Sequence, residues 1–231
     1  MHVIISTMER IFLYSHGFAM HADDGGIFND IAALFPNDTH VLFEYDNWNA
    51  DGTSAIAATF SERAKKLRAK YSDLRKNHPN AEVKLICHSQ GCNVAALAQL
   101  DGITTTILLT PPIVYSDGEQ ERARILNKPG SRLLEDESIA RQRSAGFETV
   151  YPPYYWDDFI NMTDQAQKIN TLASKTKLVI VDALQDETIV NNKDYSRLAS
   201  NLRIEHLNTD HNLIDSNGTR TAMQELIKSL F

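Results

Sequence analysis

The sequence is poor in cysteine. Its 231 residues include two cysteines, Cys87 and Cys92, which lie five positions apart across a proposed strand-to-helix turn. Such a pair provides no disulfide framework of the kind that small secreted domains use. The cysteine content therefore favours a reducing compartment, and we expect a cytoplasmic protein.

Long hydrophobic runs are also absent. No stretch approaches the ~18 consecutive apolar residues of a membrane-spanning helix. The first residues, Met1 to Ser6, form an apolar run too short for a signal-peptide core, and no cationic segment precedes it. We therefore expect neither a membrane span nor a secretory signal.

Positive charge is not in excess. The formal net charge is −7, which argues against a broad basic face for nucleic acid or an anionic membrane. No glycine-rich loop follows the first strand in a dinucleotide-binding pattern. We expect no cofactor, no metal ion and no nucleic-acid partner.

The apolar residues that are present form short runs between helical stretches. Runs rich in Val, Ile and Leu with little alternation are typical of strands covered on both faces. Alternation of strands and helices with short links predicts an α/β fold with a mainly parallel, doubly wound sheet. The expected strands cover 10–15, 40–45, 82–87, 104–109, 177–181 and 202–207, with Met1–Ser6 as a further candidate.

Helices are expected between these strands. The longest has one apolar stripe at spacings of three and four, with Asp51, Thr53 or Ser54 as its cap. Shorter helices are expected over 94–100 and near the end of the sequence. Ligands of such sheets lie beyond the carboxyl ends of the strands, so chemistry is expected in the loops there. The stripe of the long helix comprises Ile56, Phe60, Ala64, Leu67, Tyr71 and Leu74.

One segment interrupts the pattern. Residues 113–168 contain no convincing buried strand and are rich in charge, with an aromatic cluster from Tyr151 to Phe159. We interpret the segment as a cap inserted into a core made of 1–112 and 169–231. The dense charge of 117–143 is interpreted as the solvated surface of that cap; it includes Asp117, Glu119, Glu121, Arg122 and Arg124.

The main chemical signal is Cys87-His88-Ser89-Gln90-Gly91, which follows an apolar strand and opens a helix of small residues. A serine on such a sharp turn projects its hydroxyl above the sheet, and the helix offers free N–H groups to a developing anion. Alone, the motif is also consistent with a chance Ser-x-Gly in a loop. A serine nucleophile further needs a base and a carboxylate.

Both partners follow later strands. Asp186 lies in the loop after 177–181, and His211 lies in the loop after 202–207, which gives the order Ser, Asp, His. Asp182 and Glu187 are rival acids, and His206 is a rival base. A metal site made of His206, Asp210 and His211 matches no compact spacing. His88 is assigned to packing, and Cys87 is read as a small hydrophobe rather than a thiol nucleophile.

A loop upstream is a candidate oxyanion hole. The strand ending at Ser15 runs into His16-Gly17-Phe18. The backbone N–H groups of Phe18 and Gln90 could together hold the oxyanion of a tetrahedral intermediate, because Gly17 lets the backbone come close. His16 is expected to shape this loop through hydrogen bonds.

These motifs resemble the α/β-hydrolase superfamily, with its Gly-x-Ser-x-Gly turn and its triad in this order. The resemblance implies Ser89 as nucleophile, Asp186 as acid, His211 as base and an inserted cap. Cys87 stands where the family usually has its first glycine, and Asp210 stands where a glycine often precedes the histidine. Small esterases are the nearest likeness.

The expected function is therefore a serine hydrolase, a carboxylesterase that cleaves a small-molecule ester or thioester through an acyl-enzyme. The alternative is a receptor or scaffold of the same fold with slow or no turnover. The aromatic residues Tyr154, Tyr155 and Trp156 are predicted to contact substrate. The competing interpretation is that these rings only fasten the cap to the sheet.

Overall fold

In the part of the chain that the structure describes, the central sheet has six strands, and all of its pairings are parallel. A computed structural model describes residues 8–143 and 146–231, so the strand suggested for 1–6 lies outside the described residues. The strand order β11-β10-β6-β5-β1-β2 confirms the predicted parallel sheet. These strands are β1 (Arg10–Ser15), β2 (Thr39–Val41), β5 (Glu82–His88), β6 (Thr105–Leu109), β10 (Lys177–Ala183) and β11 (Arg203–Leu207).

The edge strand β2 is shorter than the predicted strand at 40–45. It ends at Val41, because the chain then turns away from the sheet and Tyr45 donates its backbone N–H to the ring of His16 (3.2 Å). Tyr45 is nevertheless fully buried. The apolar character of this stretch therefore reflects side-chain burial rather than further pairing within the sheet.

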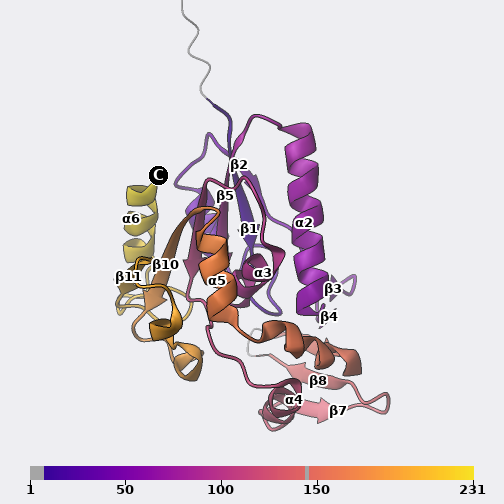
Figure 1. Ribbon diagram of the computed structural model, residues 1–231. Helices are drawn as coiled ribbons and strands as arrows, with labels where there is room; N and C mark the ends of the chain where they lie inside the picture. Colours follow the sequence, from indigo (N-terminus) through magenta and orange to yellow (C-terminus); the bar gives the residue numbers. More distant parts are fainter. Residues whose placement is uncertain (1–7, 144–145) are drawn as a thin grey trace, which may run out of the picture.

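Helices cover both faces of the sheet, as Figure 1 shows. Side chains of β1 alternate between the faces: Ile11 and Leu13 join one buried cluster, and Phe12 and Tyr14 join the other. Helices that flank the sheet contribute residues to each of the two clusters, which confirms the doubly wound arrangement. The helices are α2 (Phe60–Asn77), α3 (Gln90–Ala98) and α5 (Gln165–Ala173) on the first face, and α1 (Ile27–Ala32) and α6 (Thr221–Leu230) on the second.

The long helix α2 begins later than predicted. Its cap is Thr59, whose side chain accepts the N–H of Glu62 while the Glu62 side chain accepts the N–H of Thr59. This capping box satisfies two N–H groups that a helix start would otherwise leave free. Ile56, predicted to open the stripe, instead lies in strand β4 (Ser54–Ile56) and is 47% exposed.

The inserted segment contains strands, contrary to the expectation that it has no buried one. Ile139 and Ala140 in β8 and Tyr151 in β9 are almost fully buried. Sequence reasoning missed them because each strand is short and the partners are far apart in the chain: β4 pairs with β9. The second sheet has the order β3-β4-β9-β8-β7, with β3 (Asn47–Trp48), β7 (Ser131–Leu133), β8 (Ile139–Gln142) and β9 (Glu148–Tyr151).

The second sheet lies beyond the carboxyl ends of the central strands, at the bottom of Figure 1, together with α4 (Gly118–Leu126). The remaining elements of the described chain are short 3₁₀ helices: η1 (Pro153–Tyr155), η2 (Asp157–Met162), η3 (Val190–Asn192) and η4 (Tyr195–Arg197). The division into a core and a cap at 113–168 stays a prediction, since β3 and β4 come from the part assigned to the core.

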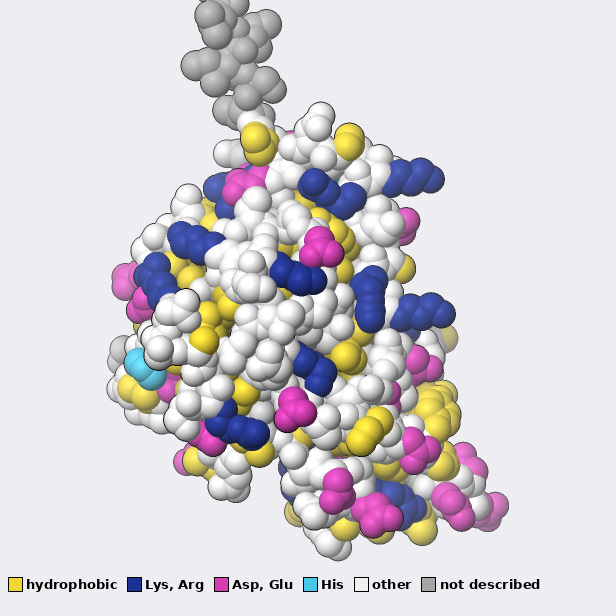
Figure 2. Space-filling view, in the orientation of Figure 1, with side chains coloured by type: hydrophobic (Ala, Val, Ile, Leu, Met, Phe, Trp, Pro, Cys, Tyr) yellow, Lys and Arg dark blue, Asp and Glu magenta, His cyan; other side chains and the backbone are white. Residues whose placement is uncertain are grey.

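The outer surface mixes charges of both signs. In Figure 2, Lys and Arg side chains are scattered along the visible face, and acidic side chains gather at its lower right. Within residues 8–143 and 146–231, no helix has both the length and the apolar character needed to cross a membrane.

Candidate active site

Ser89 sits on a strained turn between β5 and α3. Its backbone has φ 51° and ψ −127°, a conformation that non-glycine residues rarely adopt and that occurs at functional turns. The turn is tight because α3 packs against the end of β1: a Cβ on Gly91 would lie 2.0 Å from the carbonyl oxygen of Ser15. Gly91 is therefore required for the close approach that presents Ser89.

The structure brings Ser89, His211 and Asp186 together in one hydrogen-bonded chain. The Nε2 atom of His211 lies 3.0 Å from the hydroxyl of Ser89, and its Nδ1 atom lies 2.7 Å from Oδ2 of Asp186. An ionised carboxylate only accepts hydrogen bonds, so Nδ1 carries the proton. Nε2 is then free to accept the proton of the serine hydroxyl.

Asp186 is well placed to hold this tautomer. Its carboxylate is buried, and its Oδ1 atom accepts the backbone N–H groups of Thr188 (2.8 Å) and Ile189 (3.1 Å). Burial alone would raise the pKa of Asp186, but the hydrogen bond and charge of His211, with these N–H groups, outweigh burial and lower it. Asp186 is therefore an anion under ordinary conditions.

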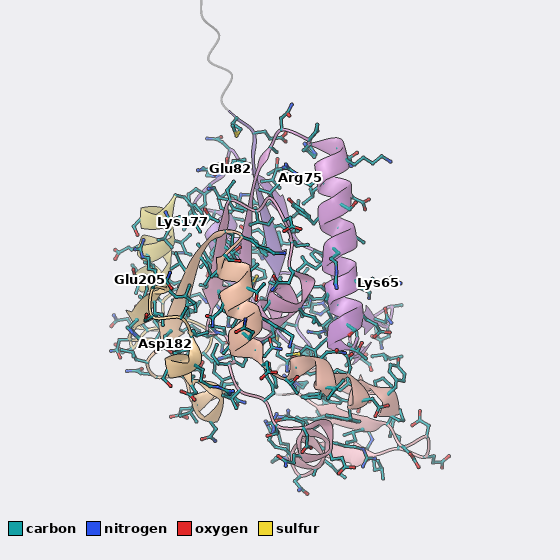
Figure 3. All side chains as sticks on the ribbon, viewed as in Figure 1. Lys65, Arg75, Glu82, Lys177, Asp182 and Glu205 are labelled. Atoms are coloured by element: carbon teal, nitrogen blue, oxygen red, sulfur yellow. The ribbon has the colours of Figure 1, made fainter. Side chains whose placement is uncertain are left out.

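The rival residues lie elsewhere. Asp182 forms ion pairs with Lys193 (2.9 Å) and His206 (3.1 Å). His206 is an exposed residue of β11. Figure 3 shows Asp182 on the lower part of β10, on the far side of the molecule from α2. Glu187 is exposed. Neither carboxylate contacts His211, so the geometry favours Asp186 as the acid.

Two further alternatives are not supported by the geometry. Cys87 is fully buried, and burial raises the pKa of its thiol, so it lacks the thiolate character of a nucleophile. The described part of the chain contains no group of three His, Cys, Asp or Glu side chains able to hold a metal ion. Asp210 instead accepts the N–H groups of Asn212 and Ile214 and so shapes the turn around His211.

The proposed oxyanion donors border the same cavity as Ser89. Phe18 and Gln90 both line it, and Gln90 is the first residue of α3, whose N–H has no partner within the helix. Among the described residues the N–H of Phe18 also meets no acceptor. His16 supports this loop, since its Nδ1 contacts the carbonyl of Gly17 (2.8 Å).

A buried ion pair between His88 and Asp24 lies beside the triad, and sequence reasoning missed it. His88 places Nδ1 2.8 Å from Oδ2 of Asp24 and Nε2 2.9 Å from the carbonyl oxygen of His211. Both partners are acceptors, so both ring nitrogens donate and His88 is an imidazolium. The same Oδ2 atom of Asp24 also accepts the N–H of Gly17 (2.8 Å).

The pKa of His88 is raised and the pKa of Asp24 is lowered, and both shifts favour the charged forms of the pair. Burial lowers the pKa of His88, but the charge and hydrogen bond of Asp24 outweigh burial and raise it. Burial raises the pKa of Asp24, but His88 and the N–H of Gly17 lower it on balance. His88 is thus more than a packing residue: it ties the loop of His211 to the loop of Gly17.

A cavity of about 340 Å³ opens above Ser89. Two of the three aromatic residues predicted to touch substrate, Tyr155 and Trp156, line it, together with Tyr151 and Phe159. Tyr154 does not line the cavity and is 54% exposed. Consecutive residues of a 3₁₀ turn point in different directions, so Tyr155 faces inward and Tyr154 faces solvent.

The interpretation of 117–143 as solvated surface is wrong in part. Glu121 is buried, and it lines the cavity together with Arg124 and Lys128 of the same segment. Arg141 and Arg143 also reach the cavity. The spacing of these residues follows no single helix or strand, which is why the sequence pattern gave no sign of a charged lining.

Searches against family models and curated proteins find no match to this sequence. Solved structures do match. GrgF, an α/β hydrolase from Penicillium sp. sh18, aligns with a TM-score of 0.66 and 16% identity over 97% of this chain and 91% of its own. The esterase domain of a Rhodothermus marinus protein aligns with a TM-score of 0.62 and 15% identity, over 97% and 88%.

Tomato methylketone synthase I aligns over 97% of both chains with a TM-score of 0.63 and 11% identity. Identities this low bear on the fold alone. Together with the parallel strand order and the helices on both faces, these alignments confirm the structural resemblance drawn from the motifs: the chain has the α/β-hydrolase fold.

Proposed function

We propose that the protein is a serine hydrolase that cleaves a small-molecule carboxylic ester or thioester through an acyl-enzyme. The observation that carries the proposal is the Ser89–His211–Asp186 chain, with contacts of 3.0 and 2.7 Å at the edge of a cavity. The fold hosts esterases such as the Rhodothermus marinus domain, but a fold alone does not fix an activity.

The proposed acylation step uses the three aligned side chains. The Ser89 oxygen attacks the ester carbonyl while its proton passes to Nε2 of His211, and the carbonyl oxygen becomes an oxyanion between the N–H groups of Phe18 and Gln90. His211 then donates that proton to the leaving alcohol or thiol as the bond to the acyl carbon breaks. Asp186 stabilises the imidazolium that forms between the two steps.

Deacylation repeats the same proton movements with water. His211 takes a proton from water, the resulting hydroxide adds to the acyl carbon, and the oxyanion forms again at the same N–H groups. Collapse of this intermediate breaks the bond to Ser89, and His211 returns its proton to the serine oxygen. The products are a carboxylic acid and the free alcohol or thiol, and no cofactor takes part.

The first prediction tests the nucleophile. Ser89→Ala should fold normally and lose labelling by a fluorophosphonate probe, and its ester turnover should fall by several orders of magnitude, on the order of 10⁶-fold. Turnover of 4-nitrophenyl esters of increasing acyl length is the measurement. Wild-type rates in the variant would refute the assignment, whereas ligand-induced thermal stabilisation of the wild type without turnover would indicate a receptor.

A further inference from the structure

The cavity above Ser89 has a cationic lining supplied by the inserted segment. Four basic side chains of that segment reach it, and so do two carboxylates, one from the insertion and one from the core. The basic residues are Arg124, Lys128, Arg141 and Arg143, and the carboxylates are Glu121 and Asp24.

Both carboxylates are already engaged. Glu121 accepts Nε of Arg124 (2.8 Å), and Asp24 accepts His88 and the N–H of Gly17. In the part of the chain that the structure describes, no carboxylate forms an ion pair with the other three cavity cations, which are Lys128, Arg141 and Arg143.

Two residues of this lining carry a buried donor without a hydrogen-bond partner in the described part of the chain. The Nε atom of Arg141 is buried and has no hydrogen-bond partner among the described residues, and the same holds for Nε1 of Trp156. Buried donors are almost always paired in folded proteins. Arg141 and Trp156 both line the cavity, so two residues of the lining carry a polar atom whose burial is not compensated by a hydrogen bond to any described residue.

The cations are also close enough to repel one another. Burial, together with the positive charges of Arg124, Arg141 and Arg143, lowers the pKa of Lys128 from its usual 10.5 to about 8. Such a cluster costs free energy in the empty protein, and an anion bound among the cations would offset that cost.

The outer side of the insertion has the opposite charge. The hairpin between β7 and β8 exposes Glu135, Asp136 and Glu137, and acidic side chains gather where the insertion lies in Figure 2. Since the whole chain carries a net charge of −7, the positive charge is local to the cavity. A local field of this kind attracts and orients anions.

We propose that the substrate carries an anionic group, a carboxylate or a phosphate, which Arg141, Arg143 and Lys128 hold while its ester carbonyl lies at Ser89. The inference rests on the proposed hydrolase function and names the substrate class. Arginine favours oxyanions because its planar fork matches their geometry. Tyr155 supplies apolar surface in the same cavity, which suits an apolar portion between the ester and the anion.

The test compares matched esters that differ only in charge. Mono-4-nitrophenyl adipate is set against 4-nitrophenyl methyl adipate, which places the charge on the acyl side. The pair 4-acetoxybenzoate and methyl 4-acetoxybenzoate places it on the alcohol side, and 4-acetoxyphenyl phosphate replaces the carboxylate by phosphate. At least one anionic ester should exceed its neutral partner in kcat/KM by about 10-fold or more, the effect of one charge-assisted hydrogen bond.

Variants then locate the anion site. Arg141→Gln and Arg143→Gln should each lower kcat/KM for the preferred anionic ester about 10- to 100-fold. Turnover of the neutral ester is the internal reference, so the ratio of the anionic to the neutral kcat/KM should fall by that factor, and circular dichroism shows whether each variant is folded. Arg132→Gln is the matched control, because it removes the same charge from the exposed residue of β7 that pairs with Glu148 outside the cavity.

The two proposals fail in different ways. Neutral esters that react as fast as their anionic partners, in a reaction that depends on Ser89, would overturn the anion site and leave the hydrolase proposal intact. If no ester reacts, binding of 4-acetamidobenzoate and adipate is measured by calorimetry. Binding that weakens at least about 10-fold in Arg141→Gln would keep the anion site, and absence of binding to the wild-type protein would remove it.

Discussion

At the scale of single residues, the candidate site depends on which partner each carboxylate has. Asp186 contacts His211 at 2.7 Å, whereas Asp182, four positions earlier, contacts Lys193 and His206. The two residues belong to the same strand and the loop that follows it, yet the chain turns between them. Their roles are therefore separable by substitutions that keep the size of the side chain.

Asp186→Asn should lower ester turnover strongly, on the order of 10⁴-fold, because the amide favours the wrong tautomer of His211. Asp182→Asn should leave turnover near wild type and change only stability, since it weakens a bond to Lys193 at a distance from the cavity. Steady-state kinetics on one ester, with circular dichroism to confirm folding, provides the comparison. The opposite ranking would assign the acid to Asp182.

At the scale of elements, the approach of α3 to β1 sets the position of the nucleophile. Gly91→Ala places a Cβ 2.0 Å from the carbonyl oxygen of Ser15 and 2.6 Å from that of His16. Backbone atoms cannot move aside cheaply, so we expect a loss of at least about 3 kcal/mol, the upper end for overpacking. Gly218→Ala, at φ 75° with open space around it, isolates the cost of backbone strain and should lose about 1 kcal/mol.

Urea unfolding of both variants gives the measurement. Equal losses for Gly91→Ala and Gly218→Ala would mean that the packing of α3 tolerates a methyl group. The distinction matters for function because displacement of α3 also moves Ser89 and the N–H of Gln90, which stand at its start.

The cationic lining predicts a pH dependence of stability. In the folded state the pKa of Lys128 is about 8 instead of 10.5. Below pH 8 Lys128 is charged in both states, and its charge is less favourable in the folded protein than in the unfolded chain. As pH rises from 8 to 10.5, the folded state loses this proton first, and the free energy of unfolding gains a contribution from Lys128.

Lys128→Met should lack this gain and should be more stable than wild type at pH 7, with a Tm higher by about 2–4 °C if the repulsion costs ~1 kcal/mol. Melting curves of both proteins at pH 7 and pH 9.5, without added anions, test the expectation. Parallel changes in the two proteins would show that Lys128 does not contribute.

At the scale of the whole molecule, the parallel sheet explains why much of the site could be predicted. Carboxyl ends of parallel strands meet at one edge, so Ser89, Asp186 and His211 were expected together from the strands that precede them. The cap of α2 was predicted wrongly as Asp51, Thr53 or Ser54, although Thr59 and Glu62 stand three positions apart in the pattern of a capping box.

Other features depend on contacts between distant parts of the chain. Strand β4 pairs with β9, which lies more than ninety residues later in the chain. A three-residue strand is too short for its hydrophobic pattern to predict such a pairing. Asp24 and His88 are ordinary residues of a turn and a strand end until the fold places them 2.8 Å apart. Arg141 and Lys128 likewise show no sign of a shared role in the sequence, because only the fold places both of them in the lining of one cavity.

The buried pair of Asp24 and His88 connects two loops of the candidate site, the loop of Gly17 and the loop of His211. Asp24 accepts the N–H of Gly17, in the loop that carries the proposed oxyanion donor Phe18, and His88 donates to the carbonyl of His211, the proposed base. Three hydrogen bonds in series join the two loops: Gly17 to Asp24, Asp24 to His88, and His88 to the carbonyl of His211. We therefore expect a displacement of the proposed oxyanion loop to displace the loop of the proposed base as well.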